Sequence, residues 1–205
     1  VEGYPSIAEV RKEPHQQYNI GGNWHTDHSY DQIPALGSML YAKELPKVGG
    51  DTLFAGCAAA FDTLSEGMKS TLRSLRAVHS SRHVFGESAA IPDDMADLFG
   101  NADKALQDAE HPVVIKHPLS GRETLYVNPG FTTRFVGWTE KESNSLLAFL
   151  YEHISRPEHT YRFQWSKGAL AFWDNRATWH LAVNDYPGET RLMHRITIEG
   201  EPLEP

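Results

Sequence analysis

Cysteine is almost absent from this sequence of 205 residues, which contains Cys57 alone. A single cysteine cannot form an internal disulfide, so a disulfide-stabilised secreted scaffold is excluded and the cytoplasm, a reducing compartment, is the expected location. No apolar run approaches the ~18–20 residues needed to cross a bilayer, and no basic-then-apolar leader stands at the N-terminus. The sequence therefore predicts no membrane insertion.

Positive charge is also scarce, because 19 Lys and Arg residues face 27 Asp and Glu residues, giving a formal net charge of -8. No basic cluster interrupts this excess, so the attraction that drives DNA and RNA binding is missing and nucleic acid is not an expected partner. A hydrophobic fraction of 40% fits one globular domain over residues 1–205. The opening residues, Val1 to Pro5, have no methionine and read like the interior of a protein, so we expect an N-terminal portion of the domain to be missing.

Short extended runs dominate the rest of the sequence, each rich in β-branched and aromatic residues and bounded by Gly, Pro or Asn. They are residues 37–43, 112–116, 124–128, 160–165, 169–173 and 191–199. Helical periodicity occurs in residues 58–76 and after the capping box formed by Thr139 and Glu142. Residues 87–110 are polar and are predicted to form a surface loop or lid. Many strands with two helices predict a β-sandwich or jelly roll flanked by helices.

The most informative segment contains His25 and Asp27. Residues i and i+2 of a strand point to the same side, so this imidazole and this carboxylate would lie ~6–7 Å apart along the strand as a pair of metal ligands. His180, after an apolar run, is the third candidate. Two imidazoles and one carboxylate leave half of an octahedral ion open, which suits non-haem Fe(II) oxygenases, whereas zinc more often takes thiolates. The other interpretation is ordinary surface or core histidines, since the chain has 11 of them.

Two arginines near the C-terminus share one face of a predicted strand. Period two places Arg191, Met193 and Arg195 on one side and Leu192, with later aliphatic residues, on the other. Either this is the solvated face of a sheet, or it lines the same cavity as His180. A buried arginine would need an anion as partner. The two guanidinium groups would lie ~13 Å apart, which suits two anions on either side of a metal.

Five short motifs follow one another along the sequence. They are Trp24-His25-Thr26-Asp27, Gly49-Gly50-Asp51-Thr52, Val127-Asn128 with Phe131-Thr132-Thr133-Arg134, Trp173-Asp174-Asn175 with His180, and Arg191 with Arg195. This combination resembles the taurine dioxygenase/2,4-D dioxygenase (TauD/TfdA) family of Fe(II)- and 2-oxoglutarate-dependent oxygenases over residues 1–200. The resemblance implies a mainly β fold with flanking helices, the double-stranded β-helix (jelly roll). It also implies Fe(II), 2-oxoglutarate and O2 as cofactor and cosubstrates, and a homo-oligomer.

The resemblance also implies roles for single residues of the metal and cosubstrate sites. His25, Asp27 and His180 would bind iron. Arg191, helped by the Thr52 hydroxyl, would bind the distal carboxylate of 2-oxoglutarate.

For the substrate, the resemblance implies a small anionic organic molecule that is hydroxylated while 2-oxoglutarate is decarboxylated to succinate. The hydroxylated product would break down spontaneously if the new hydroxyl lies beside an ether oxygen, sulfur or amine. Arg195 would face the acidic group of the substrate, with Phe85 and Phe131 beside its apolar part. Residues 77–86 look like those of aryloxypropionate-cleaving members, and Gly21 stands where taurine dioxygenase has an asparagine, so an aryloxyalkanoate-like carboxylate is favoured.

Three other functions were weighed against this one. Within the family, the alternative is a taurine or alkyl sulfonate dioxygenase or a sulfate-ester dioxygenase. Outside it, the alternative is a non-catalytic jelly-roll binding protein. A serine hydrolase is set aside because the sequence has no Gly-x-Ser-x-Gly elbow.

Overall fold

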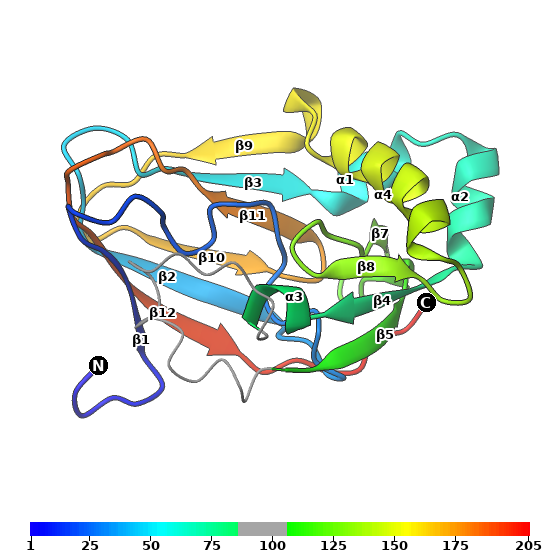
Figure 1. Ribbon diagram of the computed structural model, residues 1–205, viewed down its shortest axis with the longest axis horizontal. Helices are drawn as coiled ribbons and strands as arrows, with labels where there is room; N and C mark the ends of the chain where they lie inside the picture. The colour runs from blue at the N-terminus through cyan, green and yellow to red at the C-terminus, as the bar shows by residue number, and fades with distance from the viewer. Residues whose placement is uncertain (86–105) are drawn as a thin grey trace.

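The computed structural model describes residues 1–85 and 106–205, and these residues are mostly β-structure (Figure 1). Two antiparallel sheets make the body of the jelly roll. One has the order β1 (Ala8–Lys12), β12 (Arg191–Ile198), β2 (Gly37–Glu44), β10 (Leu170–Asp174), and the other β11 (Thr178–Ala182), β3 (Thr52–Gly56), β9 (Thr160–Phe163). The predicted fold class is confirmed.

Smaller sheets and helices gather at one end of this body (Figure 1). The small sheets are β5 (Asp108–Pro112), β4 (Arg76–Ser80), β8 (Thr132–Phe135) and the pair β6 (Val114–Lys116), β7 (Glu123–Leu125). The helices are α1 (Cys57–Asp62), α2 (Glu66–Arg73), α3 (Arg82–Phe85), α4 (Glu140–Ile154) and the 3-10 helix η3 (Pro157–His159). Across the described parts of the chain, no helix has the length and apolar character to span a membrane.

The core explains why the two large sheets face each other. Inward residues of the four-stranded sheet, including Trp173 and Met193, pack against Phe54 and Phe163 of the other sheet. Met193 on β12 is fully buried, whereas Phe172 on β10 points outward and is 55% exposed. Alternation along each strand therefore sends one set of side chains into the space between the sheets, where the candidate site lies.

Four of the predicted strands, 37–43, 160–165, 169–173 and 191–199, correspond to β2, β9, β10 and β12. The predicted strand 112–116 is instead split between β5, which ends at Pro112, and β6, which begins at Val114. The predicted strand 124–128 is shorter and shifted, as β7. Within residues 1–85 and 106–205, five strands were not predicted: β1, β3, β4, β8 and β11.

The capping box before α4 is present. The Thr139 hydroxyl accepts from the Glu142 amide at 3.3 Å, and the Thr139 amide donates to the Glu142 carboxylate at 2.8 Å. Below it, Leu147, Leu150 and Ile154 are buried, so the apolar face of α4 packs on the body as its periodicity predicts.

The prediction of one helix over residues 58–76 is wrong. The chain forms α1 and α2 there, and Arg76 already belongs to β4. Thr63 donates to the carbonyl of Ala60, and the Ser65 hydroxyl accepts from the amide of Met68 as an N-cap. These short polar side chains bond to nearby backbone groups and so end one helix and begin the next.

Most of the predicted loop or lid at 87–110 lies outside the described residues. Its last part is a correction, because residues 108–110 belong to β5 and pair with β4, Ser80 opposite Asp108. Ala109 is buried between exposed neighbours, so tertiary pairing decides this segment despite its polar composition.

Candidate metal centre

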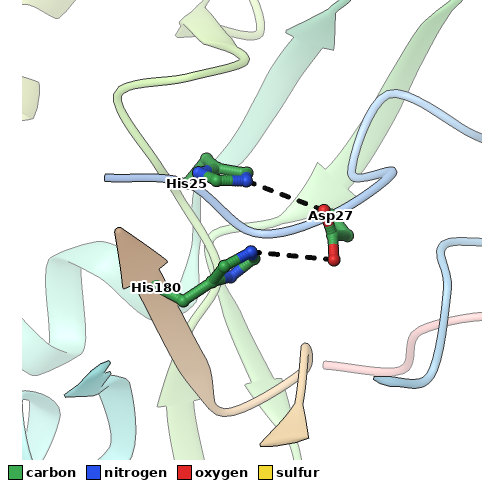
Figure 2. Close-up of side chains that lie close together, drawn as sticks. All are labelled: His25, Asp27 and His180. Carbon is green, nitrogen blue, oxygen red and sulfur yellow. Dashed lines mark ion pairs between the residues drawn. The ribbon is translucent and has the colours of Figure 1, made fainter. Parts of the chain in front are cut away.

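A short β-bridge brings the two candidate histidine ligands together. The His25 amide donates to the carbonyl of His180 at 3.1 Å, and the His180 amide donates to the carbonyl of His25 at 2.9 Å. Asp27 completes the group: its Oδ1 lies 3.6 Å from His25 Nε2, and its Oδ2 lies 3.7 Å from His180 Nε2 (Figure 2). One ligand atom from each residue lies within 4.8 Å of the others. The chain thus places two imidazole nitrogens and a carboxylate around one point.

Hydrogen bonds orient His25 and Asp27, and a ring contact orients His180. His25 Nδ1 lies 2.8 Å from the carbonyl of Asn23, and an N–H donated there would leave Nε2 available to a metal. The Asp27 carboxylate accepts from the Ser38 hydroxyl at 2.6 Å and from Arg195 Nη1 at 3.3 Å. The His180 ring packs 4.6 Å from the Trp173 ring, measured between centroids.

The charge states of these residues suit a metal. Burial lowers the pKa of His180 to about 3, helped by the neighbouring His25 and Arg195 and opposed by Asp27. Burial opposes ionisation of Asp27, but Arg195 and the two imidazoles outweigh it and hold the pKa of this carboxyl well below its usual value. At neutral pH His180 is therefore neutral and Asp27 ionised, which are the forms that bind metals. Two imidazoles and one carboxylate are a donor set that fits Fe(II).

Arg191 lies on the inward face of β12, with only 4% of its surface exposed. Its Nε donates to the carbonyl of Gly50 at 2.9 Å, while its Nη2 has no hydrogen-bond partner among residues 1–85 and 106–205. Burial lowers the pKa of Arg191, because water reaches this guanidinium poorly. Since a buried cation needs an anionic partner, the group is suited to bind one.

Thr52 belongs to the same region. It is 2% exposed, and its hydroxyl accepts from the indole N–H of Trp165 at 3.0 Å. The Trp165 ring lies 5.9 Å from the Arg191 guanidinium. Because the Thr52 hydroxyl accepts from Trp165, its O–H can still donate to another group.

The alternation of β12 decides between the two interpretations of its arginines. Arg191 and Met193 are buried, and Arg195 reaches the carboxylate of Asp27, whereas Ile196 on the opposite face is 38% exposed. The face with the arginines is thus the inner one, and the interpretation as a solvated face is wrong.

An aromatic group borders the metal ligands. The Phe131 ring is 6.4 Å from the His25 ring, measured between centroids. Tyr30 lies between the two predicted substrate residues, 4.8 Å from Phe131 and 6.1 Å from Phe85. Asn128, predicted only as part of a motif, accepts from the amide of Phe131 at 2.9 Å and so fixes its turn.

Three residues of this region were not predicted from the sequence: Ser38, Trp165 and Tyr30. Ser38 and Trp165 carry no local signal, because their partners are far away in the chain. Tyr30 could have been predicted as a site residue, because it is an aromatic residue only three positions after the candidate ligand Asp27.

A jelly roll that gathers two histidines and one aspartate beside inward arginines defines the class of non-haem metal-dependent oxygenases. A family model described as "Taurine catabolism dioxygenase TauD, TfdA family" matches residues 2–197. The chain belongs to this family. Its dioxygenases use Fe(II), 2-oxoglutarate and O2, and the His25, Asp27 and His180 cluster could hold the metal.

Relatives of this chain carry names from different substrate classes. The chain is 38% identical to an alkylsulfatase of Acinetobacter baylyi, over 87% of this chain and 57% of the relative. It is 36% identical to an alpha-ketoglutarate-dependent 2,4-dichlorophenoxyacetate dioxygenase of Burkholderia sp., over 86% of this chain and 58% of the relative. A crystal structure of a taurine dioxygenase from Burkholderia xenovorans superposes with a TM-score of 0.79 at 34% identity, covering 98% of this chain and 66% of that one. The chain thus spans less than two thirds of the length of these relatives.

Proposed function

We propose that this chain carries the catalytic centre of an Fe(II)- and 2-oxoglutarate-dependent dioxygenase that hydroxylates a small anionic organic molecule. The observation that carries the proposal is the pairing of a three-ligand cluster with a buried arginine, Arg191, whose Nη2 has no partner in the described part of the chain. A metal cluster alone would suit many proteins, and a buried arginine alone would suit many anions. The two together match the needs of a metal and a dicarboxylate.

The roles follow from position. His25, Asp27 and His180 hold the iron, which together with 2-oxoglutarate supplies the oxidising chemistry when both are bound. Arg191, with the Thr52 hydroxyl, binds one carboxylate of 2-oxoglutarate and so directs the other end of the molecule toward the metal ligands. The protein's contribution is to place these groups and keep them apart from water.

Arg195 is proposed to bind the acidic group of the substrate. It lies on the same face of β12 as Arg191, and its side chain is 23% exposed beside Asp27. Arginine binds carboxylates, sulfonates and sulfate esters through the same paired N–H groups, so charge alone does not select among them. The aromatic group of Tyr30, Phe85 and Phe131 suits a flat aryl group, which supports an aryloxyalkanoate as the first substrate to test. Alkyl sulfonates and sulfate esters are the alternative.

The test begins without substrate. Anaerobic addition of Fe(II) and then 2-oxoglutarate should produce a visible charge-transfer absorption, which a non-catalytic binding protein without an open metal site would lack. Asp27→Ala and His180→Ala should abolish both this absorption and substrate-dependent succinate formation. His15→Ala, at an exposed histidine that is not part of the cluster, is the matched control and should keep both. Full activity in either ligand variant would remove the metal assignment.

We further propose that the protein forms a homo-oligomer, on the precedent of its family. Light scattering coupled to gel filtration checks this, and the mass of a single chain at micromolar concentration would contradict it.

A further inference from the structure

Gly50 connects Arg191 to a second charged residue. The carbonyl of Gly50 accepts from Arg191 Nε at 2.9 Å, and the amide of Gly50 donates to Asp185 Oδ1 at 2.7 Å. The turn that contains Gly50 precedes β3, and Asp185 lies in the loop after β11. Both segments lie at the end of the sheets opposite α1 (Figure 1). The backbone of Gly50 is thus hydrogen-bonded to both Asp185 and Arg191.

The turn leaves no free space between these two side chains. Gly49 and Gly50 have φ angles of +84° and +71°, a conformation that favours glycine. A Cβ atom at Gly50 would lie 3.2 Å from Arg191 Cδ, and one at Gly49 would collide with the Asp185 carboxylate. Because two adjacent glycines are conformationally free by themselves, their contacts must hold the turn in place.

Arg162 on β9 supplies such a contact. Its Nη2 donates to Asp185 Oδ2 at 3.1 Å, and its Nε donates to Asp51 Oδ2 at 2.6 Å. Asp51 follows Gly50 directly and is 8% exposed, and its carbonyl accepts from the amide of Val183 at 2.9 Å. One guanidinium therefore joins the loop after β11 to the glycine turn.

We propose that Asp185 is a positioning residue for 2-oxoglutarate, which acts by fixing the Gly50 peptide and through it the direction of the Arg191 guanidinium. The Arg191 side chain makes one hydrogen bond within the described residues, from Nε to Gly50, so the Gly50 carbonyl determines where its remaining N–H groups point. The inference rests on the proposed function, in which Arg191 binds the dicarboxylate. Within the described residues, the Asp185 carboxylate bonds to Gly50 and Arg162 and not to the metal ligands.

Calorimetric titration of 2-oxoglutarate into the Mn(II)-loaded protein tests this without turnover. Asp185→Ala should weaken 2-oxoglutarate binding about tenfold, the effect of one charge-assisted hydrogen bond. Asp185→Asn keeps an oxygen for the Gly50 amide and should bind within about threefold of wild type. In steady state the KM for 2-oxoglutarate should rise in Asp185→Ala while kcat stays the same. Asp62→Ala, which breaks the exposed ion pair with Arg122 at 2.6 Å, is the matched control and should leave binding unchanged.

The possible outcomes distinguish failure of this inference from failure of the proposed function. If wild-type protein with Mn(II) does not bind 2-oxoglutarate, the proposed function fails and this inference with it. If wild type binds but Asp185→Ala binds equally well, only the inference is overturned. A fall in Mn(II) affinity as large as that in 2-oxoglutarate affinity would also overturn it, because the effect would then be structural. Should Asp185→Ala not fold, Arg162→Gln at the half-exposed end of the same contacts replaces it, with a weakening of about threefold expected and unchanged affinity overturning the proposal.

Discussion

Replacement of Ser38 by alanine would show whether Asp27 is a metal ligand that the Ser38 hydroxyl orients. Ser38 is fully buried on β2, and its hydroxyl donates to Asp27 Oδ2 at 2.6 Å. A hydrogen bond to a charged group contributes about 1.5–3 kcal/mol, so its loss should weaken metal binding roughly 10- to 100-fold. Loss of the outer partners of metal ligands has effects of the same size, ~10- to 100-fold.

The assay is direct titration of the protein with Mn(II), which avoids oxidation of Fe(II). Ser143→Ala is the matched control, because Ser143 is equally buried and its hydroxyl donates to the carbonyl of Thr139 at 2.9 Å, on α4. Ser143→Ala should lose roughly 1 kcal/mol of stability and Ser38→Ala about 1.5–3 kcal/mol, but only Ser38→Ala should lose metal affinity. A folded Ser38→Ala protein that binds Mn(II) within about twofold of wild type would refute the reasoning.

Three further results are expected. In steady-state kinetics, Arg191→Ala should raise the KM for 2-oxoglutarate at least about tenfold with little change in the KM for substrate. Arg195→Ala should raise the KM for substrate with little change in the KM for 2-oxoglutarate. Equal effects of the two variants would mean that the roles of Arg191 and Arg195 are wrongly divided. Burial, helped by His111, lowers the pKa of His79 well below its ordinary value, so this imidazole stays neutral when folded but takes up a proton when unfolded. Its contribution is complete above about pH 6.5 and is lost as the pH falls, by up to about 2 kcal/mol between pH 7 and pH 5. His79→Asn should flatten this part of the pH dependence of urea unfolding, and a wild-type slope would contradict the assignment. Thr139→Ala removes one arm of the capping box and should lower the free energy of unfolding by about 1 kcal/mol, and an unchanged melting temperature would count against the cap.

The fold was predictable where the signal is local. The capping box at Thr139 and the period of β12 depend on neighbours within a few residues, and both are present in the structure. Strands β3 and β11 were missed because their pairing partners lie far away: Thr52 is opposite Ala182, and β9 pairs on the other side of β3. Strand formation depends on such partners more than on the residues themselves.

Part of the candidate site was likewise predictable from local patterns, and the rest depends on contacts between distant residues. His25 and Asp27 face one point as predicted, but not on a strand, because His25 forms an isolated bridge and Asp27 lies in a turn. The period of β12 turns both arginines inward. The roles of Ser38 and Trp165 could not be found from the sequence, because Trp165 donates to a threonine 113 residues away and Ser38 is one serine among many. Contacts of this kind exist only once the two sheets have packed together.

The β-bridge between His25 and His180 has a consequence for folding. A metal ion bound there is a reversible cross-link between a loop near the beginning of the chain and a strand near its end. The ion binds the folded protein more tightly than the unfolded chain, because the unfolded chain would lose entropy on bringing the ligands together. Metal binding therefore stabilises the folded state. The melting temperature should therefore rise with the concentration of free Mn(II), by mass action, and this rise should vanish when either histidine is replaced.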